Sequence, residues 1–138
     1  MTSGKVLTFA DASVLIRAAL KPNAATFAAH LLALQILGDP DREFVASEFL
    51  RLEVLPIANY FRKGREIKFY EKFFDNVVHW ADDAALIAPA LSLASQHGLG
   101  ALDALHICAA DQLGAEFVSA EKPTKPIYRA YSNISSIY

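Results

Sequence analysis

Four acidic residues each lie next to or within an apolar run of this sequence. Asp11 and Glu121 follow short runs rich in β-branched and aromatic residues, whereas Glu53 and Asp103 lie inside longer apolar segments. A carboxylate beside buried apolar surface is costly unless it is paired or binds a cation. If one fold gathers all four, their repulsion disfavours the site without a bound metal. The set therefore suits a hard divalent cation, which prefers oxygen ligands.

Each acid also has a purely structural interpretation. Asp11 and Asp103 could each be a helix cap near a helix start. Glu53 could be an exposed acid on a helix, and Glu121 could be an acid in a loop. Glu48 competes with Glu53 for the same role, although a first-turn acid stabilised by the helix dipole explains Glu48 as well.

Other reactive groups are few. The single cysteine, Cys108, lies in an apolar helical run, so we expect a small buried core residue that forms no internal disulfide and no cysteine-based zinc cluster. The sequence has no Gly-rich phosphate loop and no nucleophile elbow. His106 lies on the same helix face as Asp103. An Asp-x-x-His pair can bind transition metals, but we interpret His106 as a buried residue or as a support for the acids.

Short apolar runs alternate with helix-like segments along the chain. This alternation predicts an α/β fold with a central parallel sheet of four to five short strands and helices on both faces. Strands are expected at 6–10, 43–46, 77–80 and 115–119, with a possible edge strand at 134–138. Helices are expected after Asp11 or Ser13, and then at 24–37, 47–63, 65–74, 84–97 and 103–113.

Several single residues mark where these helices begin and end. Ser47 is a good N-cap, and Asp82 or Asp83 should cap the helix at 84–97, which Gly98 ends. Pro56 should kink its helix or mark a boundary.

The expected elements also place the acids. Asp11 and Glu121 lie just past the carboxyl ends of two strands, where open α/β sheets form their sites at a switch in strand order. Glu53 and Asp103 lie on helices and must project back toward that edge.

Length and composition indicate one globular domain, residues 1–138, with a real core. The chain is 54% apolar and 20% charged, which argues against disorder. No segment reaches the roughly 18 uninterrupted apolar residues of a spanning helix, and the N-terminus does not resemble a signal peptide. We therefore expect a soluble cytoplasmic protein without a membrane role.

The net charge of −2 gives no overall attraction to nucleic acid. The distribution of charge matters more, because cations interleave with aromatic residues in the segment 60–72 and recur at 122–129. These cations could simply solvate a helix face, or they could form a phosphate-contacting rim around an acidic centre. The RNA-contact candidates in the first segment are Arg62, Lys63, Arg65 and Lys68, and the second group is Lys122, Lys125 and Arg129.

Four stretches of the chain, in this order and spacing, resemble the PIN-domain family of metal-dependent ribonucleases, especially its VapC-type toxins. The first is an Asp-x-Ser-apolar stretch at 11–17, and the second is a Ser-to-Glu-to-Leu stretch at 47–55. The third is the stretch 100–110 around Asp103, which is the nearest match, and the fourth is 117–122. In the last stretch Glu121 stands where the family more often has Asp. The longer side chain could shift a second metal or leave it held through water.

The resemblance implies that Asp11, Glu53, Asp103 and Glu121 bind Mg²⁺ or Mn²⁺, with Asp11 and Asp103 as the primary ligands. It also implies that Ser13 and Ser119 supply hydroxyls to the acids, although they could equally be strand-end or capping serines. Such a site would hydrolyse RNA phosphodiester bonds as an endoribonuclease, since two divalent ions can activate water and stabilise the leaving oxygen.

The implied biological role is the toxin of a type II toxin–antitoxin pair, a homodimer inhibited by a small antitoxin. The aromatic content exceeds what one small core needs, so part of it fits a protein interface. The residues concerned are Phe27, Phe49, Tyr60, Phe61, Phe69, Tyr70, Phe73 and Phe74.

Two other functions remain open at this point. One is a PIN-like module that binds RNA or protein without cutting. The other is a metal-dependent phosphohydrolase of small substrates, against which the basic segments argue weakly.

Overall fold

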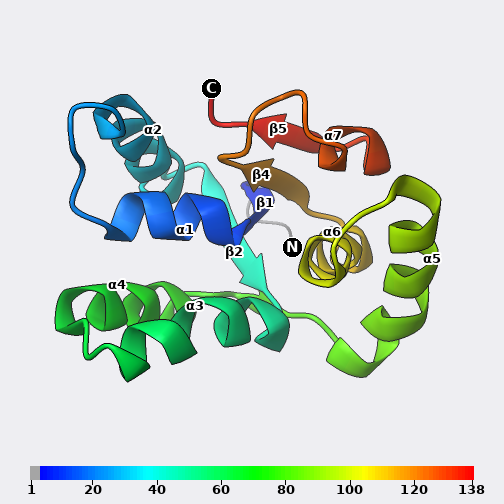
Figure 1. Cartoon of the computed structure of the whole chain (residues 1–138). Coiled ribbons are helices and arrows are strands. Elements are labelled where there is room, and N and C mark those ends of the chain that lie inside the picture. Colours follow the sequence, from blue (N-terminus) through cyan, green and yellow to red (C-terminus); the bar gives the residue numbers. More distant parts are fainter. Residues whose placement is uncertain (1–3) are drawn as a thin grey trace.

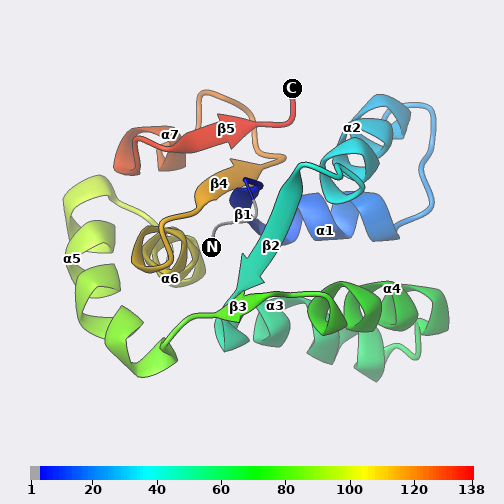
Figure 2. The ribbon, with the colours of Figure 1, turned by 180° about the vertical axis from the view of Figure 1, so that it is seen from behind.

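β1 (Val6–Ala10) is the central strand of a five-stranded sheet in the computed structural model, which describes residues 4–138. The order is β3-β2-β1-β4-β5, and every pairing is parallel (Figure 2). The predicted α/β fold with a short-stranded parallel sheet is confirmed. Residues 1–3 of the predicted domain 1–138 lie outside the described residues. The other strands are β2 (Arg42–Ala46), β3 (His79–Trp80), β4 (Glu116–Ser119) and β5 (Ile134–Ser136).

Helices cover both faces of the sheet, as predicted. Figure 1 shows α1 and α2 on one side and α5 and α6 on the other, while α3 and α4 pack as a pair near α1. The α-helices are α1 (Ala12–Ala19), α2 (Phe27–Leu37), α3 (Glu48–Tyr60), α4 (Gly64–Asp75), α5 (Ile87–His97), α6 (Ala101–Gln112) and α7 (Ile127–Ala130), and the 3₁₀-helix η1 covers Asp83–Leu86.

Local capping explains where several helices start and stop. The Asp11 carboxylate accepts the backbone N–H of Ala12 at 2.8 Å, and the Ser47 hydroxyl accepts that of Leu50 at 3.4 Å. Gly98 ends α5 with φ of 68°, a left-handed conformation that glycine adopts without strain.

Pro56 does not mark a helix boundary, so that alternative of the prediction was wrong. The helix runs from Glu48 to Tyr60 with Pro56 inside it. Pro56 is exposed, so water can hydrate the carbonyl that loses its N–H partner.

Other boundaries differ from the predicted ones. α2 begins only at Phe27, because Asn23 and Thr26 exchange side-chain and backbone hydrogen bonds of 3.0 Å in a turn. Neither predicted aspartate caps α5: η1 precedes it, and the Asp83 carboxylate instead accepts the backbone N–H of Glu48 at the start of α3. α7 was not predicted.

The strand order contains a switch point between β1 and β4. The chain moves outward from β1 to β2 and β3, then returns to place β4 and β5 on the opposite side of β1. In the register of this pair Ala10 lies opposite Val118. Asp11 and Ser119 therefore emerge side by side at the carboxyl edge, where open α/β sheets form their sites.

No single helix of residues 4–138 is long and apolar enough to cross a membrane. One bent pair, Asp83–His97 with Ala101–Gln112, meets the length and composition requirements jointly, with a bend of 119° between its members.

Candidate functional site

Asp11 is the buried centre of the site, with 4% of its surface exposed. One carboxylate oxygen, Oδ1, accepts the Ala12 N–H that caps α1. The other, Oδ2, accepts the hydroxyls of Ser13 at 2.9 Å and Ser119 at 3.1 Å. The carboxylate is thus held in one orientation by two elements that meet at the switch point.

The two serines also join α1 to the segment that follows β4. The Ser13 hydroxyl oxygen accepts the backbone N–H of Ala120, and that of Ser119 accepts the N–H of Glu121, each at 3.0 Å. Each serine therefore donates to Asp11 and accepts from the loop that carries Glu121.

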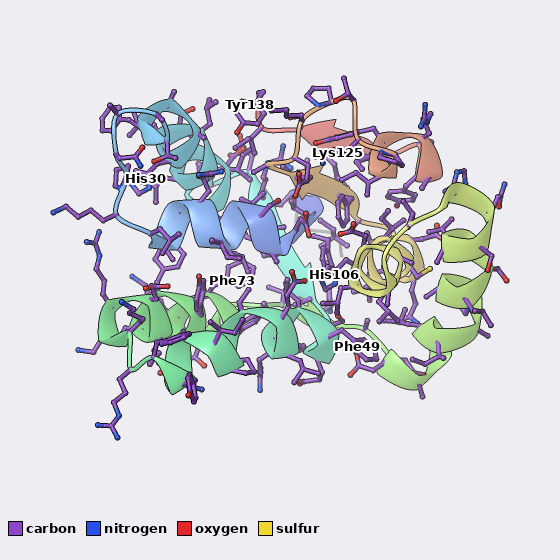
Figure 3. The ribbon with its side chains drawn as sticks, viewed as in Figure 1. His30, Phe49, Phe73, His106, Lys125 and Tyr138 are labelled. Carbon is purple, nitrogen blue, oxygen red and sulfur yellow. The ribbon has the colours of Figure 1, made fainter. Side chains whose placement is uncertain are left out.

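Glu53 reaches the same region from α3. Its Oε1 lies 2.6 Å from Nε2 of His106, which projects from α6 and has no exposed surface (Figure 3). The sequence had indicated a buried or supporting histidine here but not its partner. Glu48 points elsewhere: it is exposed and lies 3.6 Å from Arg51. Of the two rival glutamates, only Glu53 is joined to the site.

Asp103 and Glu121 line one hollow at the start of α6. The cavity has a volume of about 240 Å³ and is bordered by the turn before α6, the segment after β4 and the start of α7. Lys125 also lines it, and its charge acts on Asp103. Both acids are exposed.

The electrostatics connect the acids to one another. Burial raises the pKa of Asp11 above its ordinary value of 3.8, and the charges of Asp103 and Glu53 raise it further, while His106 and the Ser13 hydroxyl oppose them. Desolvation likewise raises the pKa of Asp103, as do the charges of Glu53 and Glu121, against His106 and Lys125. Each of the four predicted acids thus acts on, or is acted on by, at least one other, with Asp103 linked to all three of the rest.

The donor set fits a hard divalent ion. Its members are carboxylate oxygens that repel one another, and an added cation would relieve that repulsion. In the part of the chain that the structure describes, no three His, Cys, Asp or Glu side chains are already arranged to hold one metal ion. Mg²⁺ keeps several waters and needs only one or two protein carboxylates, so this arrangement suits it.

The RNA-contact candidates lie around the turn between α3 and α4, and Glu66 of α4 lines a hollow that Glu53 also borders. Arg62 and Lys63 fall in the turn after α3, and Arg65 and Lys68 at the start of α4; all four are exposed. α3 continues for about 10 Å beyond Glu53 before this turn begins.

Apo Asp103→Asn is expected to be more stable than the wild type at pH 7, by about 2 °C in Tm, because solvent screening limits an exposed charge to under about 1 kcal/mol. The pKa of Asp103 is raised in the folded state, so the wild type loses stability as pH rises from 3.8 through the folded pKa. The variant lacks that loss, so the Tm values of the variant and the wild type should converge at lower pH. Thermal unfolding in chelator across this range measures the difference. A variant Tm equal to or below that of the wild type at pH 7 would count against a repulsive cluster.

Sequence comparison identifies one family. The PIN domain model matches residues 8–125, which include all four acids and both serines. A search of curated proteins finds no match.

Solved structures of the same fold cover nearly the whole chain. One is a toxin–antitoxin complex from Klebsiella pneumoniae, with a TM-score of 0.64, 19% identity and coverage of 95% of this chain and 98% of that one. Another is VapBC2 from Rickettsia felis bound to a DNA fragment from the promoter, with a TM-score of 0.65, 13% identity and the same coverage. A third is FitAcB from Neisseria gonorrhoeae, with a TM-score of 0.57, 19% identity and coverage of 94% and 95%. At these identities the likeness concerns the fold alone.

Proposed function

The chain belongs to the PIN domain family, and on that premise we propose that it is an endoribonuclease that depends on Mg²⁺ or Mn²⁺. The observation that carries the proposal is the buried Asp11 carboxylate at the switch point, electrostatically coupled to Asp103 and Glu53. A repulsive set of acids around one buried carboxylate is costly for folding and becomes favourable when a cation binds. The proposed catalytic domain comprises residues 1–138.

Each residue has a proposed role in this site. Asp11 and Asp103 are the primary metal ligands, and Glu53 and Glu121 bind metal directly or through water. Ser13 and Ser119 hold the Asp11 carboxylate in place through the bonds to Oδ2. When bound, divalent ions would activate water and neutralise charge on the phosphate and the leaving oxygen.

The basic residues are proposed to position the substrate. Lys125, at the hollow that Asp103 and Glu121 line, would meet a phosphate near the cleaved bond. The cations at the α3–α4 turn would contact the RNA backbone farther along the strand. Such contacts orient a polyanion without reading its sequence.

Metal removal tests the proposed activity. Purified protein with Mn²⁺ should cleave an RNA containing unpaired segments, whereas excess EDTA should stop the reaction and added Mn²⁺ should restore it. Glu53→Gln should lower the rate strongly, and Glu48→Gln on the same helix should not. Cleavage that persists in EDTA, or equal loss in both variants, would reject the proposal.

We also propose that the chain is the toxin of a type II toxin–antitoxin pair and acts in the cytoplasm as a homodimer. The structures of like fold include a toxin–antitoxin complex. Large apolar side chains lie on the surface, such as Tyr60 at 79% and Phe61 at 61% exposure, and these fit a protein interface. Expression of this chain is expected to arrest growth, and a small protein encoded beside its gene is expected to relieve the arrest.

A monomer in sedimentation at micromolar concentration would refute the dimer.

A further inference from the structure

The contact between Glu53 and His106 joins two helices at the site. The 2.6 Å distance between Oε1 and Nε2 is that of a short, charge-assisted hydrogen bond. His106 has no exposed surface, whereas the Glu53 side chain is 30% exposed. A buried group on α6 therefore anchors the more accessible carboxylate on α3.

The imidazole packs against β1, one of the strands that carry the site. Its ring lies 5.5 Å from that of Phe9 on β1, and Phe9 stacks on Phe117 of β4 at 5.7 Å. β1 and β4 are the strands that Asp11 and Glu121 follow. The position of Glu53 is thereby tied to the sheet edge that holds the other acids.

The direction of the hydrogen bond follows from chemistry. An ionised carboxylate can only accept, so Nε2 of His106 carries the hydrogen. Nδ1 is buried and has no hydrogen-bond partner in the part of the chain that the structure describes. One oxygen of Glu53 is thus occupied by the imidazole, which leaves Oε2 for another ligand.

We propose that His106 is a positioning residue that presents the free oxygen of Glu53 to the divalent ion of the site. This inference rests on the proposed function, because it assumes that Glu53 serves a metal. Groups that hydrogen-bond a ligating side chain typically change metal affinity by about 10–100-fold when removed. A histidine that only filled the core would change folding stability and leave the metal affinity of the folded protein unchanged.

Two polar substitutions separate these roles. In His106→Gln the side-chain N–H lies about as far along the chain as Nε2, so it can still donate to Glu53. In His106→Asn the N–H lies nearer the position of Nδ1 and falls short. Both variants place an amide in the same buried site, so His106→Gln serves as the matched control for His106→Asn.

The measurement is Mn²⁺ affinity, followed by electron paramagnetic resonance of the free ion, with thermal unfolding run on the same samples. His106→Asn is expected to bind Mn²⁺ about 10–100-fold more weakly than the wild type, and His106→Gln to remain near the wild type. In a Glu53→Gln background the Asn substitution should have no further effect on Mn²⁺ affinity, because residue 53 no longer presents a carboxylate to the ion even where its amide oxygen still accepts from His106.

The outcomes distinguish the inference from the proposed function. If the wild type binds Mn²⁺ and both His106 variants bind it equally well, or equally weakly, the positioning role is overturned while the metal site stands. Additive losses in the Glu53→Gln background would also overturn it. If the wild type binds no Mn²⁺, the proposed function fails and the inference fails with it.

Discussion

Asp11→Asn and Asp103→Asn are each expected to lower RNA cleavage by about a thousandfold or more, because losing a metal-bound carboxylate removes about 4 kcal/mol of transition-state stabilisation. Each substitution removes one negative charge at nearly constant volume. In Asp11→Asn the amide oxygen can still accept the Ala12 N–H that caps α1, so the helix start survives. The amide nitrogen that replaces Oδ2 cannot accept the Ser13 and Ser119 hydroxyls, so Asp11→Asn should lose some stability, whereas apo Asp103→Asn should gain a little. The loss of activity should appear in variants that are still folded at the assay temperature.

Cleavage of a labelled RNA under single-turnover conditions measures this effect. Asp111→Asn is the matched control for Asp103→Asn, since Asp111 is an exposed acid near the other end of α6. It should retain wild-type activity. Full activity in either site variant, with normal thermal unfolding, would remove these acids from the reaction.

Replacing Arg62, Lys63, Arg65 and Lys68 together with Ala is expected to weaken RNA binding about tenfold or more at low salt. All four side chains are exposed around the α3–α4 turn and lack carboxylate partners in the salt bridges of the described residues. If each meets one phosphate, the slope of log K against log salt should become shallower by about 3. Mn²⁺ binding should be unchanged, because none of the four is a proposed metal ligand.

A single-charge comparison on α4 controls for general loss of positive charge. Lys68→Ala should reduce RNA affinity, whereas Lys72→Ala should not, since Lys72 borders a separate apolar hollow between α2 and α4. Filter binding across a salt series measures both. A quadruple variant with wild-type affinity and slope would mean that these cations only solvate the helix pair.

The sequence predicted the parts of this molecule that depend on neighbouring residues. β1 was predicted to the residue, because an apolar β-branched run ends at an acid that can cap a helix. The position of Asp11 followed directly, since sites form where parallel strands end. Ser47 at the start of α3 was predicted for the same kind of local reason.

Features that depend on distant residues escaped prediction. The bond between Glu53 and His106 joins residues far apart in the chain, so no local spacing reveals it. Asp83 looked like a helix cap, but its carboxylate accepts a hydrogen bond from α3 instead. α7 is a single short turn after a proline-rich stretch, and such a turn lacks the periodicity of a longer helix.

Anomalous diffraction from crystals grown with Mn²⁺ tests the central claim most directly. We expect an anomalous peak between the carboxylates of Asp11 and Asp103, with Glu53 close enough to bind directly or through water. The peak should be absent from crystals of Asp11→Asn grown in the same solution. A wild-type crystal without a peak at this position, or with Mn²⁺ bound only elsewhere, would contradict the claim that these acids form a metal site.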